Sequence, residues 1–177
     1  MSVVDSRLHG NDGLASRPNN ELQIRDALHQ NHSAHATGTI AMTDAPIGPP
    51  EALASIAMVA IAADGYLADQ EGQDMTMLLS RMALFSSYSS DDLNRLFNAT
   101  LNRLKQQGPG VLVNQAKTAL PPDLRETAFA IATDLVLSDR TVTPQEQAFL
   151  EDLYRILEIP SALAHQIVQV MTIKNRG

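Results

Sequence analysis

The stretch "AADGYLADQE", from Ala62 to Glu71, decides the fold, because a related stretch, "LSDRTVTPQE", follows from Leu137 to Glu146. An apolar segment precedes each stretch, and an amphipathic segment follows it. We therefore predict that the chain forms the same unit twice: a helix, an acidic turn and a second helix. Four pairs of positions match at a constant separation of 75 residues: Asp64 and Asp139, Leu67 and Val142, Gln70 and Gln145, and Glu71 and Glu146.

Apolar residues on both sides of the acidic stretches keep the same separation. A repeat of this length exceeds the roughly 20–50-residue periods of stacked solenoid proteins. Two related helical hairpins packed face to face are the simpler interpretation. The matched apolar pairs are Ala57 and Ala132, Ile61 and Val136, Met75 and Leu150, Leu78 and Leu153, and Met82 and Leu157.

The composition favours one helical domain with a hydrophobic core. Of the 177 residues, 44% are hydrophobic, which is enough apolar material for a single core. Aromatic residues make up only 4%, Trp is absent, and Ala, Leu, Ile and Met dominate the apolar set. This mixture favours helices over strands. We predict an all-α fold, a compact bundle of about seven helices without strands.

Capping and stop signals divide the chain into these helices. Ser89, with Asp92 three residues later, is a capping-box pattern, and Gly108 is a typical stop. Thr143 and Glu146 form a second capping box. The predicted helices cover about 51–63, 69–84, 90–107, 110–120, 122–137 and 143–157, and the last follows Pro160.

Residues 1–46 differ from the rest of the chain. They are rich in Gly, Asn, Ser, His and Pro and have little apolar periodicity, so we expect a disordered tail followed by a helical domain at 47–177. The segment "VVDSRLHGNDGL" resembles a translated fragment of a dispersed bacterial repeat, which makes Met42 an alternative start. The His29, His32 and His35 spacing is interpreted as compositional coincidence.

Charge and cysteine content exclude several functional classes. The net charge of −7 argues against a nucleic-acid surface, and it favours cations or basic surfaces as partners. The absence of Cys excludes disulfides and thiolate metal sites. The longest apolar run, Ala52 to Ala63, is too short to span a membrane. We expect a cytoplasmic protein that does not insert directly into a membrane.

The acidic turns allow two interpretations. The pattern Asp-Gly followed by an apolar residue and a Glu matches part of an EF-hand calcium loop. However, Ala60 and Ala62 occupy the first and third loop positions, where oxygen ligands are required, so these are not EF-hands. In one interpretation, the glutamates cap helices and the aspartates bind turn amides. In the other, the two turns share one divalent cation or bind one each.

Three further residues are functional candidates: Arg125, Asp134 and His165. Arg125 either pairs with a corner carboxylate or forms a solvated pair with Glu126, and Asp134 either joins the second acidic turn or faces water. His165 has no evident catalytic partner. We find no phosphate loop, metalloprotease motif or nucleophile elbow, so we predict that the protein is not an enzyme. The methionines Met58, Met75, Met77 and Met82 are predicted core residues.

The two acidic turns and the stretch "LPPDLRETAFAIATDLVLSDRTVTPQEQAFLEDLYRILEI" resemble the TerB-like tellurite-resistance family over about residues 50–172. The resemblance implies a compact helical domain with a stress-related role. It also implies a divalent-metal site formed by Asp64, Glu71, Asp139 and Glu146. Arg140 replaces the Gly65 of the first turn, so the second turn departs from the pattern.

The resemblance leads to a primary functional expectation and an alternative. We expect a non-enzymatic module that binds Ca²⁺ or Mg²⁺ through its acidic turns. The alternative is a structural interaction module whose acidic face docks a protein partner without metal. Direct detoxification of tellurite is excluded, because the acidic domain would repel an oxyanion and has no thiol to reduce it. The sequence leaves the identity of the metal, the partner and the oligomeric state open.

Overall fold

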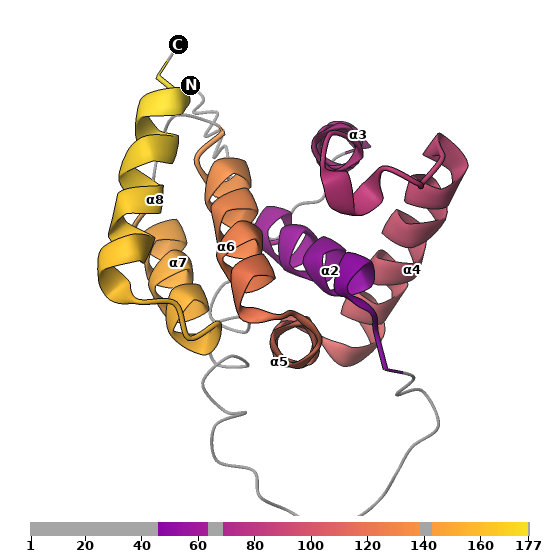
Figure 1. Ribbon diagram of the computed structural model, residues 1–177, viewed down its shortest axis with the longest axis horizontal. Helices are drawn as coiled ribbons and strands as arrows, with labels where there is room; N and C mark the ends of the chain where they lie inside the picture. The colour runs from indigo at the N-terminus through magenta and orange to yellow at the C-terminus, as the bar shows by residue number, and fades with distance from the viewer. Residues whose placement is uncertain (1–45, 64–68, 139–142, 177) are drawn as a thin grey trace, which may run out of the picture.

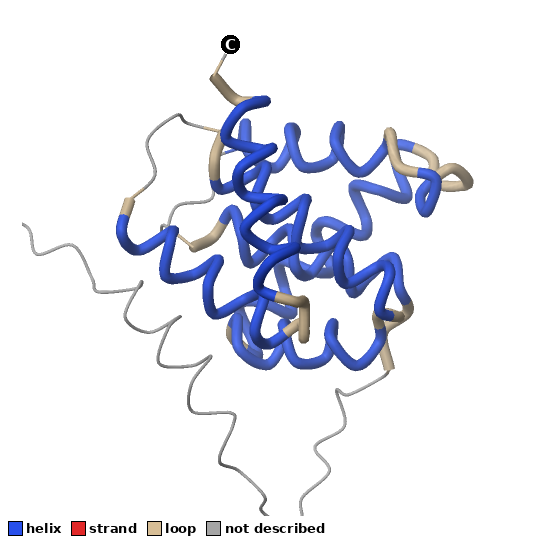
Figure 2. Tube along the Cα trace, turned by 60° about the vertical axis from the view of Figure 1, so that its left-hand side comes forward, coloured by secondary structure: helices blue, strands red, loops and turns tan. Residues whose placement is uncertain are grey.

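The computed structural model describes residues 46–63, 69–138 and 143–176, and within these ranges the chain forms helices and no strand (Figure 1). Figure 2 shows these helices joined mainly by short loops. The predicted all-α bundle is confirmed. The helices are α2 (Pro49–Ile61), α3 (Asp69–Ser80), α4 (Ser90–Gln107), α5 (Pro109–Ala119), α6 (Pro122–Val136), α7 (Pro144–Ile156) and α8 (Ser161–Lys174), with a 3₁₀ turn, η1 (Ala83–Phe85).

The predicted boundaries of α4 follow from its capping residues. The amide of Asp92 donates to Ser89 Oγ at 3.2 Å, and the amide of Ser89 donates to Asp92 Oδ2 at 2.9 Å. Gly108 ends α4 with φ of 81°, a conformation that favours glycine, and its amide donates to the carbonyl of Leu104 at 2.9 Å. Because Pro109 then starts α5, one glycine separates two helices.

The second helix is shorter than predicted. The sequence pattern extends it to Leu84, whereas α3 ends at Ser80. Ser80 Oγ donates to the carbonyl of Met77 at 2.7 Å, and Met82 is extended, with φ of −90° and ψ of 143°. This break lets η1 place the Phe85 ring in the core, where it is fully buried. Tertiary packing therefore overrides the helical periodicity at this end.

Helix α2 forms the centre of the molecule. Every residue from Ala52 to Ile61 is buried, including Ser55, whose hydroxyl donates to the carbonyl of Glu51 at 2.7 Å. The helix packs most extensively against α5, α6 and α4. In Figure 1 it crosses the middle of the bundle, with α6, α7 and α8 on one side and α3 and α4 on the other.

The structure agrees with the predicted duplication. Helices α2 and α3 form one hairpin, helices α6 and α7 form the other, and the two hairpins pack through α2 and α6. Ala57 and Ala132, which are equivalent, are both fully buried, and Ile61 and Val136 also lie in the core. The equivalence is looser in the second helices, because Leu78 is half-buried while Leu153 is fully buried.

The methionines confirm the core prediction only in part. Met58 and Met75 are buried, and Met82 packs against the core from a half-buried position. Met77 is 55% exposed, so its assignment to the core is wrong. It lies on the side of α3 that faces away from α2 and α4, where helical spacing alone does not distinguish a covered face from an open one.

Candidate functional site

The structure describes only part of the four-residue metal site predicted from the sequence. Asp64 and Asp139 lie outside the described residues. Glu71 falls in the first turn of α3, but its side chain also lies outside them. Glu146 is fully described and lies in the first turn of α7. Glu146 and the helix ends that lead into each corner are therefore the described part of the predicted site.

Glu146 takes part in the predicted capping box. Its Oε2 accepts a hydrogen bond from the amide of Thr143 at 2.7 Å, and its own amide donates to Thr143 Oγ1 at 3.2 Å. These bonds satisfy two amides at the start of α7 that have no partner within the helix. The capping interpretation is thus confirmed for Glu146. Of the two carboxylate oxygens of Glu146, Oε2 is the one that accepts the capping hydrogen bond from the Thr143 amide.

The two helices that precede the acidic corners end in the same way. At the end of α2, the Ala62 amide donates to the carbonyl of Met58 at 3.1 Å. At the end of α6, the Leu137 amide donates to the carbonyl of Thr133 at 3.0 Å. Ala62 corresponds to Leu137 in the duplication, and Met58 corresponds to Thr133. The two helices therefore end with the same hydrogen-bond pattern just before each corner. The next amides agree as well: Ala63 donates to Ala60 and Ser138 donates to Leu135, each at 3.3 Å.

Comparison with known proteins identifies the family. A family model, Tellurite resistance protein TerB, matches residues 50–169, which run from the first turn of α2 to the middle of α8. The chain belongs to the TerB family. The family expected from the sequence is therefore confirmed. A search among curated proteins and a search among solved structures each returned no match.

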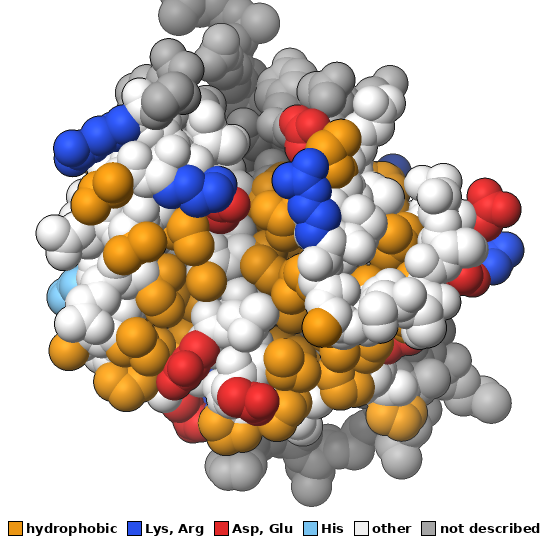
Figure 3. All heavy atoms as spheres, turned by 45° about the horizontal axis from the view of Figure 1, so that its top comes forward, with side chains coloured by type: hydrophobic (Ala, Val, Ile, Leu, Met, Phe, Trp, Pro, Cys, Tyr) orange, Lys and Arg blue, Asp and Glu red, His pale blue; other side chains and the backbone are white. Residues whose placement is uncertain are grey.

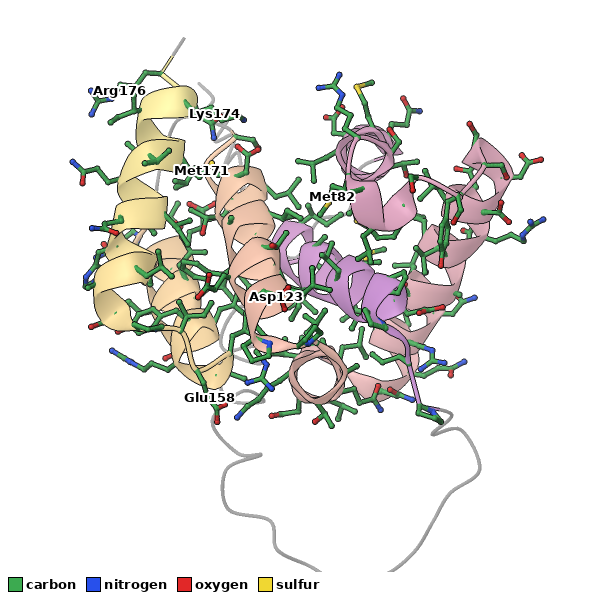
Figure 4. The ribbon with its side chains drawn as sticks, in the orientation of Figure 1. Met82, Asp123, Glu158, Met171, Lys174 and Arg176 are labelled. Carbon is green, nitrogen blue, oxygen red and sulfur yellow. The ribbon has the colours of Figure 1, made fainter. Side chains whose placement is uncertain are left out.

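An ion pair lies in the last turns of α6, the helix of the TerB domain that leads into the second corner. Asp134, in the last turns of α6, accepts hydrogen bonds from Lys174 Nζ at 2.7 and 2.9 Å, and its side chain is 16% exposed. Asn175 Nδ2 also donates to Asp134 Oδ1, at 3.1 Å. Figure 4 shows Lys174 at the end of α8 that lies next to the end of α6. Asp134 is therefore paired and largely covered, so the interpretation that it faces water is wrong. Asp139 lies outside the described residues, so the interpretation that Asp134 joins the second acidic turn stays a prediction.

Among the residues that the structure describes, Arg125 of the TerB domain pairs with Glu158 rather than with Glu126 or Glu146. Its Nη1 donates to Glu158 Oε2 at 2.9 Å, and its Nε donates to the carbonyl of Leu120 at 3.0 Å. Lys117 Nζ donates to the other oxygen of Glu158 at 2.8 Å. Hydrogen bonds from Lys117 and Arg125 hold the pKa of the Glu158 carboxyl below its usual value. Glu158 thus joins α5, α6 and the end of α7.

Among the residues that the structure describes, no three acidic or histidine side chains gather as a metal ion would require. On the face shown in Figure 3, acidic and basic side chains are scattered around a broad area of hydrophobic ones. The large hydrophobic side chains Met77, Val170 and Ile173 are more than half exposed. No described helix combines the length and apolar character needed to cross a membrane.

Proposed function

We propose that this TerB domain is a non-enzymatic module that binds a divalent cation, Ca²⁺ or Mg²⁺, through its two acidic corners, in a response to stress such as tellurite exposure. The observation that carries the proposal is the matched ending of α2 and α6, followed in each case by an Asp and, seven residues later, a Glu. The backbone geometry and the carboxylates are both duplicated. We expect this result when selection preserves the carboxylates as well as the helices.

The packing of the two helices supports a shared or paired site. Helix α2 packs along α6, and its C-terminal end lies beside α6 (Figure 1). The first corner therefore starts next to the helix from whose end the second corner starts. A Ca²⁺ ion takes about 6–8 oxygen ligands. One corner supplies too few, so we propose that carboxylates from both corners, completed by water, surround the ion or ions.

The two corners should differ in affinity. In the second corner, Arg140 directly follows Asp139. Asp134, which lies about one helical turn before the corner, pairs with Lys174 and so brings a second cation close to it. Both cations raise the electrostatic cost of placing a divalent ion there. The first corner has Gly65 in the equivalent position. We therefore expect Asp64 to contribute more to metal affinity than Asp139.

Calorimetric titration of Ca²⁺ and Mg²⁺ into the full chain tests the proposal. Replacing Asp64→Asn should weaken binding the most, Asp139→Asn should weaken it less, and the double variant should abolish it. Asp123→Asn is the matched control, since Asp123 is an exposed aspartate at the opposite end of α6 (Figure 4). Equal binding heats in the control and in both corner variants would refute the proposed site.

A second candidate is a structural interaction module without metal. It is favoured by the bond between Glu146 and Thr143, which assigns a corner glutamate to helix capping. In this case the corners only fix the angle between two helices, and a partner docks on the surface. Metal would then leave the melting temperature unchanged, because a ligand that binds only the folded state must raise it. Replacing Glu146→Ala would lower stability by about 0.5–2 kcal/mol.

A further inference from the structure

A polar cleft separate from the acidic corners lies between the start of α2 and one face of α4. Its volume is about 350 Å³, and its lining includes Glu51, Ser55, Tyr88, Leu96, Thr100 and Arg103. Ser55, Leu96 and Thr100 are buried. The volume lies at the lower end of the range for small-molecule sites, which is about 300–1,000 Å³.

Arg103 brings to this cleft a guanidinium that forms no ion pair with another described residue. Its Nη1 is buried and has no hydrogen-bond acceptor among the residues that the structure describes. Arg95, which also lines the cleft, pairs with Asp92 instead. Burial removes water from Nη1 without supplying an acceptor, a cost that proteins normally avoid. A guanidinium in this state favours a carboxylate, whose two oxygens fit its planar donors.

Another part of the cleft, lined by Glu51 and Tyr88, carries negative charge. Burial raises the pKa of the Tyr88 hydroxyl, and the negative charges of Glu51 and Asp92 raise it further. Asp92 already accepts hydrogen bonds from Ser89 and Arg95. Within the described part of the chain, the Glu51 carboxylate has no ion pair. It therefore favours a positively charged group.

We propose that this cleft binds a small amphoteric ligand of the amino-carboxylate class, with the ligand carboxylate at Arg103 and its ammonium at Glu51. Leu96 and Ala99 supply apolar surface for a short carbon chain. Thr100 supplies a hydroxyl one turn from Arg103. A simple anion would gain the interaction with Arg103 but would be repelled by Glu51, so a ligand with both charges fits best. The proposal is independent of the metal site, because it uses none of the same residues.

An NMR titration of the full chain with 4-aminobutanoate tests this assignment. The amide signals of Leu96, Ala99 and Thr100 should shift at millimolar ligand. Butanoate, which lacks the ammonium, and butylamine, which lacks the carboxylate, should each bind roughly tenfold more weakly or worse. Equal binding of butanoate, or of butylamine, would overturn the amphoteric ligand. Absence of any shift at the cleft would overturn the site.

Variants separate the cleft from nonspecific binding. Arg103→Gln should weaken binding of 4-aminobutanoate and butanoate roughly tenfold or more, and Glu51→Gln should weaken only 4-aminobutanoate. Ala99→Leu fills the cleft from an exposed helical position with a good helix former, so it should block binding in a folded protein. Arg176→Gln, an exposed arginine outside the cleft, is the control. Binding that survives Ala99→Leu, or that falls equally in Arg176→Gln, contradicts the proposal.

Discussion

Helices α2 and α6 occupy equivalent places in the two hairpins, yet their surroundings differ. Helix α2 is buried from Ala52 to Ile61, because α4, α5 and α6 pack around it. Helix α6 is covered by α2, α7 and α8 and leaves Asp123 and Glu126 exposed. The two helices nevertheless end with the same hydrogen bonds. The duplication therefore preserves local backbone geometry, while the position in the bundle determines which copy forms the core.

The second helices of the hairpins differ in a similar way. Helix α3 packs against α4, and Gly72 allows the close approach, because a Cβ there would lie 2.8 Å from the Phe97 ring. Helix α7 has the exposed Gln147 at the equivalent position and packs against α6, α5 and α8. Each copy has thus adapted to a different neighbour. The differences between the copies suggest three stability experiments, and the capping box of α4, outside both copies, suggests a fourth.

The largest expected effect comes from truncating the equivalent isoleucines of α2 and α6. Ile56→Ala removes a fully buried side chain at the centre of the bundle, and Ile131→Ala removes one that is 8% exposed. Such truncations cost about 2–5 kcal/mol, depending on how far the site can collapse. We expect Ile56→Ala near the upper end and Ile131→Ala near the lower end in urea unfolding. Equal losses would show that α2 is not the more central copy.

Removing the cap of α7 should have the next largest effect. Thr143→Ala deletes the hydroxyl that accepts the Glu146 amide, which should lower the unfolding free energy by about 1 kcal/mol. It also makes the second corner resemble the first, where Ala68 occupies the equivalent position. Metal binding should persist in this variant. Loss of the calorimetric metal signal together with the cap would contradict this expectation and show that metal binding depends on the capped start of α7.

Gly72→Ala should have a smaller net effect because two terms oppose each other. The added Cβ collides with the Phe97 ring, and overpacking costs about 1–3 kcal/mol. The higher helix propensity of Ala offsets up to about 1 kcal/mol of this. The contacted atom is at the far end of the half-buried Phe97 ring, which can shift, so the overpacking cost should lie near the lower end of its range. We therefore expect a net loss of up to about 1 kcal/mol, relieved when Phe97→Leu is added. Gln147→Ala in α7 is the matched control and should be nearly neutral.

The capping box of α4 should give the smallest effect, and this effect should change with pH only in acid. Hydrogen bonds from Ser89 and Arg95 lower the pKa of Asp92 from 3.8 to about 2. Because the folded-state pKa is depressed, its contribution to stability is present above pH 3.8 and is lost as the pH falls through about 2. Urea midpoints of the wild type and Asp92→Asn should therefore converge in this range. A constant difference down to the lowest pH would contradict the sign of this shift.

Local signals in the sequence predicted most of the helices. Ser89, Gly108 and Thr143 mark boundaries through their own backbone preferences or side-chain hydrogen bonds, which operate within a few residues. The end of α3 was missed because burial of Phe85, a tertiary requirement, interrupts a continuous helical pattern. Helical periodicity in the sequence indicates which face of a helix is apolar. It does not indicate where packing against a neighbouring element ends that helix.

The candidate site was less predictable because its contacts are long-range. Arg125 meets Glu158 across 33 residues, and Lys174 meets Asp134 across 40 residues. No spacing rule indicates such pairs. The cleft near Arg103 also joins two helices distant in sequence, although the stripe Asp92, Leu96, Ala99 and Arg103, which spans about three turns of α4, was a signal that could have been read. The acidic corners were found because duplication makes them visible in the sequence itself.

The change in melting temperature on adding Ca²⁺ or Mg²⁺ to metal-free protein tests the central claim most directly. A cation held by the carboxylates of the folded corners must raise the melting temperature progressively with its concentration. We predict this rise in the wild type and in Asp123→Asn, and its loss in the double variant Asp64→Asn/Asp139→Asn. A rise of the same size in the double variant, or none in the wild type, would contradict the account.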